Sequence, residues 1–140
     1  MLGSEFKYVL AIDCETSGIV SKSLNPGCNN NERAQAVAWG VCVVEFATLD
    51  IAEELYVEIQ PLEGMMWSSR AEAVHGLSKQ YLKQHGKQEL ESALDIAELI
   101  IKYWGADTPV IVLGHNVWFD KCFLDEMFKR YGIGVVSLIV

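Results

Sequence analysis

Two acidic residues, Asp13 and Glu15, follow a short apolar run in the stretch YVLAIDCETSG. Side chains alternate along a strand, so acids two positions apart share one face while Cys14 takes the other. A third acid, Asp120, lies in GHNVWFD, directly after a second apolar run, PVIVL. Because ligand sites of open α/β sheets lie beyond the carboxyl ends of strands, we expect the three carboxylates to meet at one edge of a sheet.

Crowded carboxylates repel one another unless a cation neutralises them. Oxygen ligands without a Cys/His cluster favour Mg²⁺ or Mn²⁺ over Zn²⁺, and two such ions can support phosphodiester hydrolysis. Each piece also has a plainer interpretation. A D-x-E pair is often a solvated strand end, Asp120 is an ordinary first-turn acid, and His75 in AVHGL is typical of a turn histidine bonded to backbone.

Hydrophobic periodicity predicts the elements that would position these acids. The predicted strands cover Tyr8 to Ile12, Ala36 to Phe46, Glu54 to Gln60, Pro109 to Leu113 and Ile133 to Val140. The predicted helices cover Glu89 to Trp104 and Trp118 to Tyr131, with Asn116 a possible N-cap, and short helices between Met65 and Gly86, one capped by Ser78. This order is typical of an α/β domain with a mixed sheet and flanking helices.

One side of the helix over Glu89 to Trp104 is expected to be buried. Its predicted apolar stripe consists of Leu90, Ala93, Leu94, Ala97, Ile100, Ile101 and Trp104. The stretch from Ser17 to Gln35 has no periodicity and is predicted to be a loop.

Composition sets further bounds. A chain of 140 residues that is 51% hydrophobic is the size of one domain. It has no apolar run of roughly 18 residues and no signal-peptide pattern, so we expect a cytoplasmic protein without a membrane contact. The net charge of −8 argues against a surface that coats nucleic acid. The four cysteines lack C-x-x-C spacing and are expected to be buried free thiols. Residues 1–6 read as a vector remnant.

Taken together, AIDCETSG, AVHGL and GHNVWFD resemble the DEDD superfamily of DnaQ-like 3'-to-5' exonucleases. The resemblance covers most of Tyr8 to Tyr131. It implies a ribonuclease H-like fold, Mg²⁺ or Mn²⁺ as cofactor, and the release of nucleoside monophosphates from the 3' end of a single-stranded nucleic acid, DNA or RNA.

The same resemblance assigns roles to individual residues. Asp13 would bridge two metal ions, Glu15 would hold the ion that activates water, and Asp120 would support the second ion. The residues that would contact the substrate are Thr16, Gly18, His75, Leu77, His115 and Asn116.

One departure from the family pattern affects the predicted activity. The family's fourth aspartate and its general-base histidine or tyrosine lie on a helix after the last strand, and this sequence ends at Val140. We therefore expect residues 7–140 to form a single exonuclease-like domain that is incomplete at its C-terminus, binds metal weakly and hydrolyses poorly. Two alternatives remain: a non-catalytic module that binds nucleic acid or docks a partner, and a chain that self-associates through the apolar strand GVVSLIV.

Overall fold

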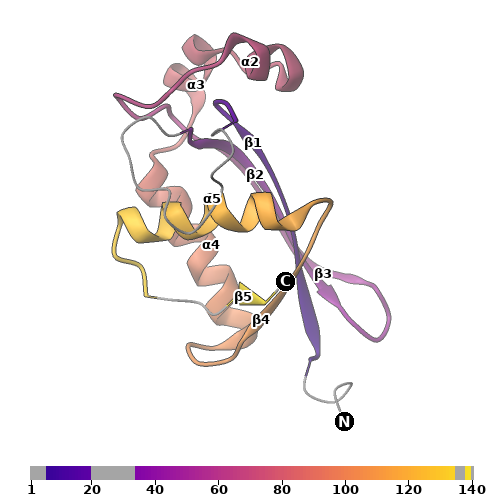
Figure 1. The fold of residues 1–140 in the computed structure, drawn as a ribbon. Coiled ribbons are helices and arrows are strands. Elements are labelled where there is room, and N and C mark those ends of the chain that lie inside the picture. The colour runs from indigo at the N-terminus through magenta and orange to yellow at the C-terminus, as the bar shows by residue number, and fades with distance from the viewer. Residues whose placement is uncertain (1–5, 20–33, 135–137, 140) are drawn as a thin grey trace.

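The computed structural model describes residues 6–19, 34–134 and 138–139. Its strands are β1 (Tyr8–Thr16), β2 (Ala36–Glu45), β3 (Ile51–Glu58), β4 (Val110–Leu113) and β5 (Leu138–Ile139). Its helices are α2 (Ser69–His75), α3 (Lys79–His85), α4 (Glu89–Trp104) and α5 (Val117–Arg130) (Figure 1). No helix among these residues is long and apolar enough to cross a membrane.

The strands form one mixed sheet in the order β3-β2-β1-β4-β5. The first three strands pair antiparallel, whereas β4 pairs parallel with β1 and β5 pairs parallel with β4. The predicted α/β class with a mixed sheet is confirmed. β1 lies at the centre of the sheet, so any group at its end can be reached from both neighbouring strands.

Helices α4 and α5 pack on one face of the sheet (Figure 1). Leu10 and Ile12 of β1, and Trp39 of β2, contribute to the core on that face. Burying a Leu or Ile side chain contributes about 1.5–3 kcal/mol, so this face supplies most of the apolar stabilisation. The opposite face carries the odd-numbered residues of β1.

The predicted stripe on α4 is partly wrong. Ala93, Ala97 and Ile100 are buried as expected, but Leu90 and Ile101 are about half exposed, as is Leu94. The buried surface is rotated toward Ile96 and Leu99, because α4 contacts α5 as well as the sheet. Both layers therefore set which side of the helix faces inward.

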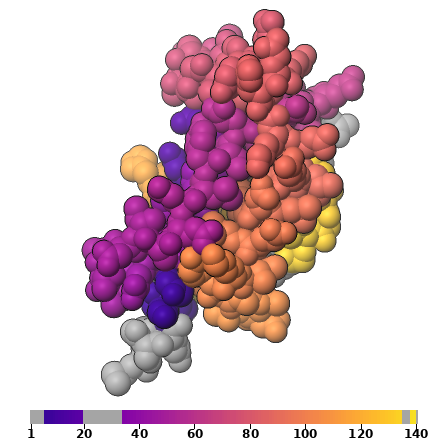
Figure 2. Space-filling model, turned by 180° about the vertical axis from the view of Figure 1, so that it is seen from behind, coloured from indigo at the N-terminus to yellow at the C-terminus, as the bar shows by residue number. Residues whose placement is uncertain are grey.

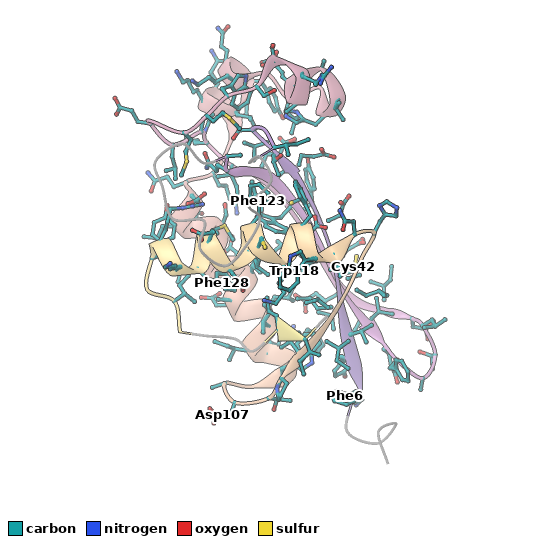
Figure 3. The ribbon with its side chains drawn as sticks, in the orientation of Figure 1. Phe6, Cys42, Asp107, Trp118, Phe123 and Phe128 are labelled. Carbon is teal, nitrogen blue, oxygen red and sulfur yellow. The ribbon has the colours of Figure 1, made fainter. Side chains whose placement is uncertain are left out.

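Helix α5 separates its aromatic residues between core and surface. Phe123 and Phe128 are buried, whereas Trp118 is 47% exposed and leaves the helix on the side away from Phe123 (Figure 3). Seen from the opposite direction, the β2–β3 hairpin projects beside α4 (Figure 2). Lys102 Nζ and Tyr103 Oη on α4 both donate to Glu53 of β3, at 2.6 and 2.9 Å.

Two short helices, α2 and α3, lie beyond the end of β1 that carries Thr16 (Figure 1). Ser68 caps α2 by accepting from Ala71 N–H, and Ser78 caps α3 by accepting from Tyr81 N–H, as predicted for Ser78. Both caps fix short helices that propensity alone would leave marginal.

Some predicted boundaries change. β1 runs to Thr16 instead of Ile12, so the D-x-E acids lie inside the strand, paired with β2, and not after its end. β3 begins at Ile51 because the hairpin pairing starts opposite Val44. Of the strand predicted from Ile133, the described residues form Leu138–Ile139. The predicted vector remnant (except Phe6) and most of the predicted loop from Ser17 to Gln35 lie outside the described residues.

A buried polar network, which we call the Glu89 network, consists of Gln35, Glu89 and Arg130. Arg130 donates to both carboxylate oxygens of Glu89, from Nε at 2.7 Å and from Nη2 at 2.9 Å. Gln35 Nε2 donates to Glu89 Oε2 at 3.0 Å and to Gln60 O, while Gln35 Oε1 accepts from Leu62 N–H. The network ties the starts of β2 and α4 to the end of α5, and every charge in it is paired.

Candidate functional site

Asp13 and Glu15 project from the face of the sheet that α4 and α5 leave open. Asp13 lies opposite Gly40 and Glu15 opposite Ala38, so small residues of β2 flank both carboxylates. Asp13 is exposed and Glu15 is half-buried, while Cys14 between them is buried on the helix side. The predicted shared face of the two acids is thus confirmed, and both carboxylates are open to a ligand.

Asp120 is joined to the same strand by a hydrogen bond. Its Oδ1 accepts from the backbone N–H of Cys14 at 2.9 Å, and the residue is only 3% exposed. The pairing of β1 with β4 ends at Ala11 and Leu113, so Asp120 supplies an acceptor to β1 beyond the end of β4. The carboxylate therefore fixes the first turn of α5 against the strand that carries Asp13.

Gly114 allows this close approach. A Cβ at this position would lie 2.6 Å from the carbonyl oxygen of Ile12, which is closer than side-chain carbons pack against backbone. The chain can therefore leave β4 pressed against β1 only with glycine here. This contact sets where α5 begins, and with it the position of Asp120.

The electrostatics at Asp120 reflect its burial. Burial raises the pKa of the Asp120 carboxyl, the charge of Asp13 raises it further, and the contacts with Cys14 act in the opposite direction. Burial likewise raises the pKa of the Cys14 thiol, helped by the charges of Asp120, Asp13 and Glu15. Burial and the neighbouring acids thus favour the neutral forms of both groups.

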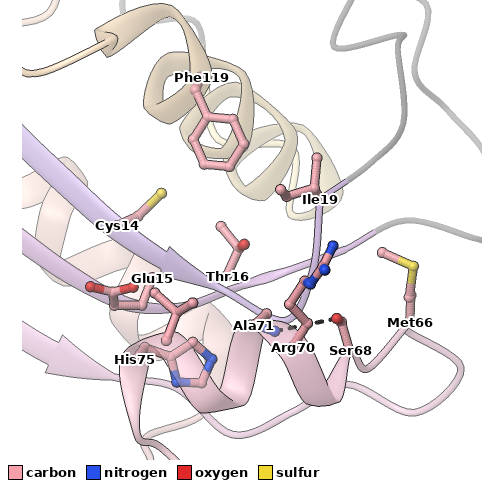
Figure 4. Close-up of a pocket in the computed structure, with 11 residues that line it drawn as sticks. Cys14, Glu15, Thr16, Ile19, Met66, Ser68, Arg70, Ala71, His75 and Phe119 are labelled. Carbon is pink, nitrogen blue, oxygen red and sulfur yellow. Dashed lines mark hydrogen bonds between the residues drawn. The ribbon is translucent and has the colours of Figure 1, made fainter.

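A pocket of about 470 Å³ opens next to these acids (Figure 4). Its lining residues are Cys14, Glu15, Thr16, Ile19, Met66, Ser68, Arg70, Ala71, Val74, His75 and Phe119. They come from the end of β1, the segment before α2, α2 itself and the first turn of α5. The walls are largely apolar with a few polar groups, and the volume is within the range of small-molecule pockets.

Hydrogen bonds of backbone N–H groups hold the pocket wall to β1. Ser17 and Gln35 exchange two bonds, Ser17 N–H to Gln35 O at 2.8 Å and Gln35 N–H to Ser17 Oγ at 2.9 Å. Ser68 N–H then donates to Ser17 O at 2.7 Å. A Cβ on Gly18 would lie 2.5 Å from Met66 Cε, so the glycine lets Met66 pack against the end of the strand.

His75 has one satisfied and one unsatisfied ring nitrogen. Its Nδ1 accepts from Leu77 N–H at 3.0 Å, which places the proton of a neutral ring on Nε2. Nε2 is buried and finds no hydrogen-bond partner among the residues that the structure describes. The backbone bond predicted for a turn histidine is confirmed, and it leaves a second donor unused in a pocket-lining side chain.

The sequence-predicted residues divide into two groups. Glu15, Thr16 and His75 line the pocket, and Asp13 and Asp120 lie next to it. The others do not line it: Gly18 packs behind Met66, Leu77 lies past the end of α2, and His115 and Asn116 are exposed before α5. Asn116 occupies the N-cap position, but its side chain makes no capping bond.

Several lining residues were not predicted. Phe119 lines the pocket and also packs against the core, and no site role was predicted for it or for Ile19, Met66, Arg70 or Val74. Met66, Arg70 and Val74 come from a segment whose pattern does not place it at the end of β1, and the hydrogen bond from Ser68 N–H to Ser17 O holds that segment there.

The donor set at this site suits a hard divalent cation, because Asp13 and Glu15 offer carboxylate oxygens on one face. The described residues contain no group of three or more His, Cys, Asp or Glu side chains arranged to hold a metal ion. Asp120 is directed to the Cys14 N–H instead. Two carboxylates are therefore free to bind an ion, and the third carboxylate has a protein partner.

Similar folds occur among solved exonucleases. A product-bound exonuclease I matches 89% of this chain and 25% of its own, with a TM-score of 0.68 and 18% identity. E. coli exonuclease I in complex with a dT13 oligonucleotide matches 89% of this chain and 24% of its own, with a TM-score of 0.67 and 19% identity. The nuclease domain of 3'hExo, a DEDDh family member bound to rAMP, matches 94% of this chain and 62% of its own, with a TM-score of 0.66 and 15% identity.

These likenesses establish the fold. The chain has the ribonuclease H-like α/β fold of these exonucleases, as predicted. It spans about a quarter of the exonuclease I chains and less than two thirds of the 3'hExo nuclease domain. No family model matches the sequence, and no curated protein matches it.

Proposed function

We propose that the chain is the nuclease-fold part of a metal-dependent 3'-to-5' exonuclease that acts on single-stranded DNA or RNA. The observation that carries this proposal is the arrangement at the end of β1. Asp13 and Glu15 share the open face, Asp120 binds the backbone between them, and a pocket begins at Glu15. A folded protein gains no stability from placing two unpaired carboxylates side by side, so a ligand explains them better.

The pocket supports a nucleotide as that ligand. Apolar side chains of Met66, Val74 and Phe119 offer surface for a base or sugar, and the unused Nε2 donor of His75 belongs to the same wall. The solved proteins of similar fold were bound to a reaction product, to oligonucleotides and to rAMP. We infer that the 3'-terminal nucleotide enters here, with its 5' phosphate toward Asp13 and Glu15.

Asp13 and Glu15 would hold Mg²⁺ or Mn²⁺, which, when bound, stabilises the charge that develops on a phosphate under attack. The reaction breaks the P–O3' bond with water, giving a nucleoside 5'-monophosphate and a strand shortened by one residue with a new 3' hydroxyl. Asp120 acts as a positioning residue, because its hydrogen bond from Cys14 N–H fixes α5 to β1 at the residue next to Asp13. Thr16 Oγ1, which donates to Gly18 O at 2.8 Å, shapes the pocket floor.

The metal site is tested by calorimetry with Mn²⁺ at neutral pH on the wild-type chain and on Asp13→Asn. Asp107→Asn is the matched control, because Asp107 is an exposed acid in the turn before β4, away from the pocket (Figure 3). We expect binding in the wild type and in Asp107→Asn, and none in Asp13→Asn. Equal binding in all three would remove the metal site from Asp13.

Activity is tested on DNA and RNA oligonucleotides of one sequence, labelled at the 5' end, with Mg²⁺ or Mn²⁺. Stepwise shortening from the 3' end that Asp13→Asn abolishes is the expected result, and the faster of the two substrates identifies the preferred nucleic acid. Products shortened from the 5' end, or cut internally, would contradict the proposed direction.

A second candidate is a non-catalytic module that binds nucleic acid or a partner through the same fold. It is favoured by one observation: the described residues do not assemble three metal-ligating side chains, since Asp120 is bonded to Cys14. Metal-independent oligonucleotide binding without any shortening would select this candidate. The predicted self-association through the C-terminal strand stays a prediction, and light scattering over a range of concentrations tests it.

A further inference from the structure

Arg70 lies in the first turn of α2 and lines the pocket from the side opposite Glu15 (Figure 4). Among the described lining residues it is the sole Lys or Arg, and Glu15 is the sole Asp or Glu. The pocket is therefore polarised, with the Glu15 carboxylate and the Arg70 guanidinium apart from each other, and its lining also includes the apolar side chains of Met66, Val74 and Phe119.

Arg70 makes no hydrogen bond or ion pair within the described part of the chain. Its helix offers no acid at the two positions that would face it, because Ala73 and Val74 lie three and four residues further on. The neighbouring Glu72 carboxylate already accepts from Trp67 Nε1 and Lys79 N–H, both at 3.2 Å.

The other described basic side chains divide into two groups. Salt bridges to acids are made by Lys87, Lys102, Lys121 and Arg130. Lys7, Lys79, Lys83 and Lys129 form no ion pair with a described acid, but none of these four residues lines the pocket. A guanidinium without an acid partner, at the mouth of a pocket, is available for an anion from outside the protein.

We propose that Arg70 binds a phosphate group of the nucleotide or strand seated in this pocket, an inference that rests on the proposed function. The guanidinium keeps its charge at any working pH and presents a planar fork that matches two phosphate oxygens. Asp13 and Glu15 repel a phosphate when no metal is bound, and Arg70 offsets this repulsion from the opposite side. The contact needs no metal, so binding experiments without metal can distinguish it from metal binding at Asp13 and Glu15.

The test measures binding in EDTA at low salt for three ligands: a nucleoside, its 5'-monophosphate, and a single-stranded oligonucleotide ending in that nucleotide. We expect the wild-type chain to bind the monophosphate about tenfold tighter than the nucleoside, as one charge-assisted contact would give. Arg70→Gln should remove that difference and leave nucleoside binding unchanged, whereas Arg70→Lys should keep part of it.

The matched control is Lys83→Gln, because Lys83 is an exposed cation of α3 that does not line the pocket. If the loss in Arg70→Gln were a general charge effect, Lys83→Gln would show it too. Raising the salt concentration should also weaken monophosphate binding in the wild type, whereas it should not weaken it in Arg70→Gln, where only the repulsion from Asp13 and Glu15 remains to be screened.

The oligonucleotide identifies the source of the phosphate. Loss of affinity in Arg70→Gln for both the monophosphate and the oligonucleotide places Arg70 at the phosphate of the terminal nucleotide, and loss for the oligonucleotide alone places it at a phosphate further along the strand. Unchanged affinity for both overturns the inference and leaves the proposed function standing. If the wild type binds none of the three ligands, with or without Mn²⁺, the proposed function fails and the inference fails with it.

Discussion

The Glu89 network and the Asp13–Glu15 pair place carboxylates in very different surroundings within one small domain. The Glu89 side chain is fully buried, yet Arg130 and Gln35 satisfy both of its oxygens. Asp13 and Glu15 lie on an open face, and neither forms an ion pair with a described basic residue. A buried charge must be paired inside the protein, whereas exposed like charges are solvated by water and stay available for a ligand.

The contrast separates residues that stabilise the fold, such as Glu89, from residues that the fold exposes to a ligand, such as Asp13 and Glu15. The two regions are also connected, because Gln35 belongs to the Glu89 network and forms two hydrogen bonds with Ser17 at the end of β1. Gln35 O accepts from Ser17 N–H, and Gln35 N–H donates to Ser17 Oγ. The satisfied network therefore supports the strand end that carries the unsatisfied acids. Substitutions in the first region should lower stability, and substitutions in the second should lower binding and leave stability in place.

The largest effect is expected from Glu89→Ala. It leaves the partly buried Arg130 guanidinium without its acceptor and removes one of the two acceptors of Gln35 Nε2, which costs about 3 kcal/mol of unfolding free energy. Urea denaturation measures this. The control is Glu91→Ala, an exposed acid 4.0 Å from Lys87, expected to change stability by less than about 0.5 kcal/mol. Similar stability losses for both variants would contradict a special role for the network.

A smaller effect is expected from a substitution of Asp13, which should weaken metal binding and leave the metal-free stability unchanged. Asp13→Asn should leave the metal-free unfolding free energy within about 0.5 kcal/mol of the wild type, or raise it, because it removes repulsion. Mn²⁺ at a hundredfold excess over its dissociation constant should stabilise the wild type by about 2.7 kcal/mol and the variant not at all. Thermal denaturation with and without Mn²⁺ decides this, and a variant destabilised without metal would place Asp13 among the structural residues.

His75→Asn tests the unsatisfied donor in the pocket wall. Asparagine can still accept from Leu77 N–H two residues on, so the turn is retained while Nε2 is lost. Stability should stay within about 0.5 kcal/mol of the wild type, and affinity for a nucleoside monophosphate should fall about tenfold, the value of one hydrogen bond. Calorimetry measures the affinity. Unchanged affinity would mean that Nε2 takes no part in binding.

The two regions also differ in how far the sequence reveals them. β1, α4 and the shared face of Asp13 and Glu15 could be predicted, because alternation and helical period act between near neighbours. The Glu89 network could not, since Gln35 and Arg130 lie 54 and 41 residues from Glu89 and carry no local pattern. The pocket wall at Met66 and Arg70 escaped prediction for the same reason, because its place depends on a hydrogen bond from Ser68 to Ser17.

Asp120 lies between these two kinds of residue, since it is buried like Glu89 but belongs to the acidic site. Its pKa is raised in the folded state by burial, so the folded protein favours the protonated carboxyl. The stability that this gives is fully present below the ordinary carboxyl pKa and is lost as pH rises through the folded value.

Asp120→Asn removes the ionisable group, and with it this loss of stability at rising pH, while the amide oxygen can still accept from the Cys14 N–H. In EDTA, the variant should therefore gain stability relative to the wild type as pH rises from acid to neutral, with little difference between the two chains at the acid end. Urea denaturation at a series of pH values measures this smallest effect. If the wild type instead gains on the variant as pH rises, the bond to Cys14 outweighs burial, and Asp120 would resemble Glu89 as a carboxylate whose charge the fold itself stabilises.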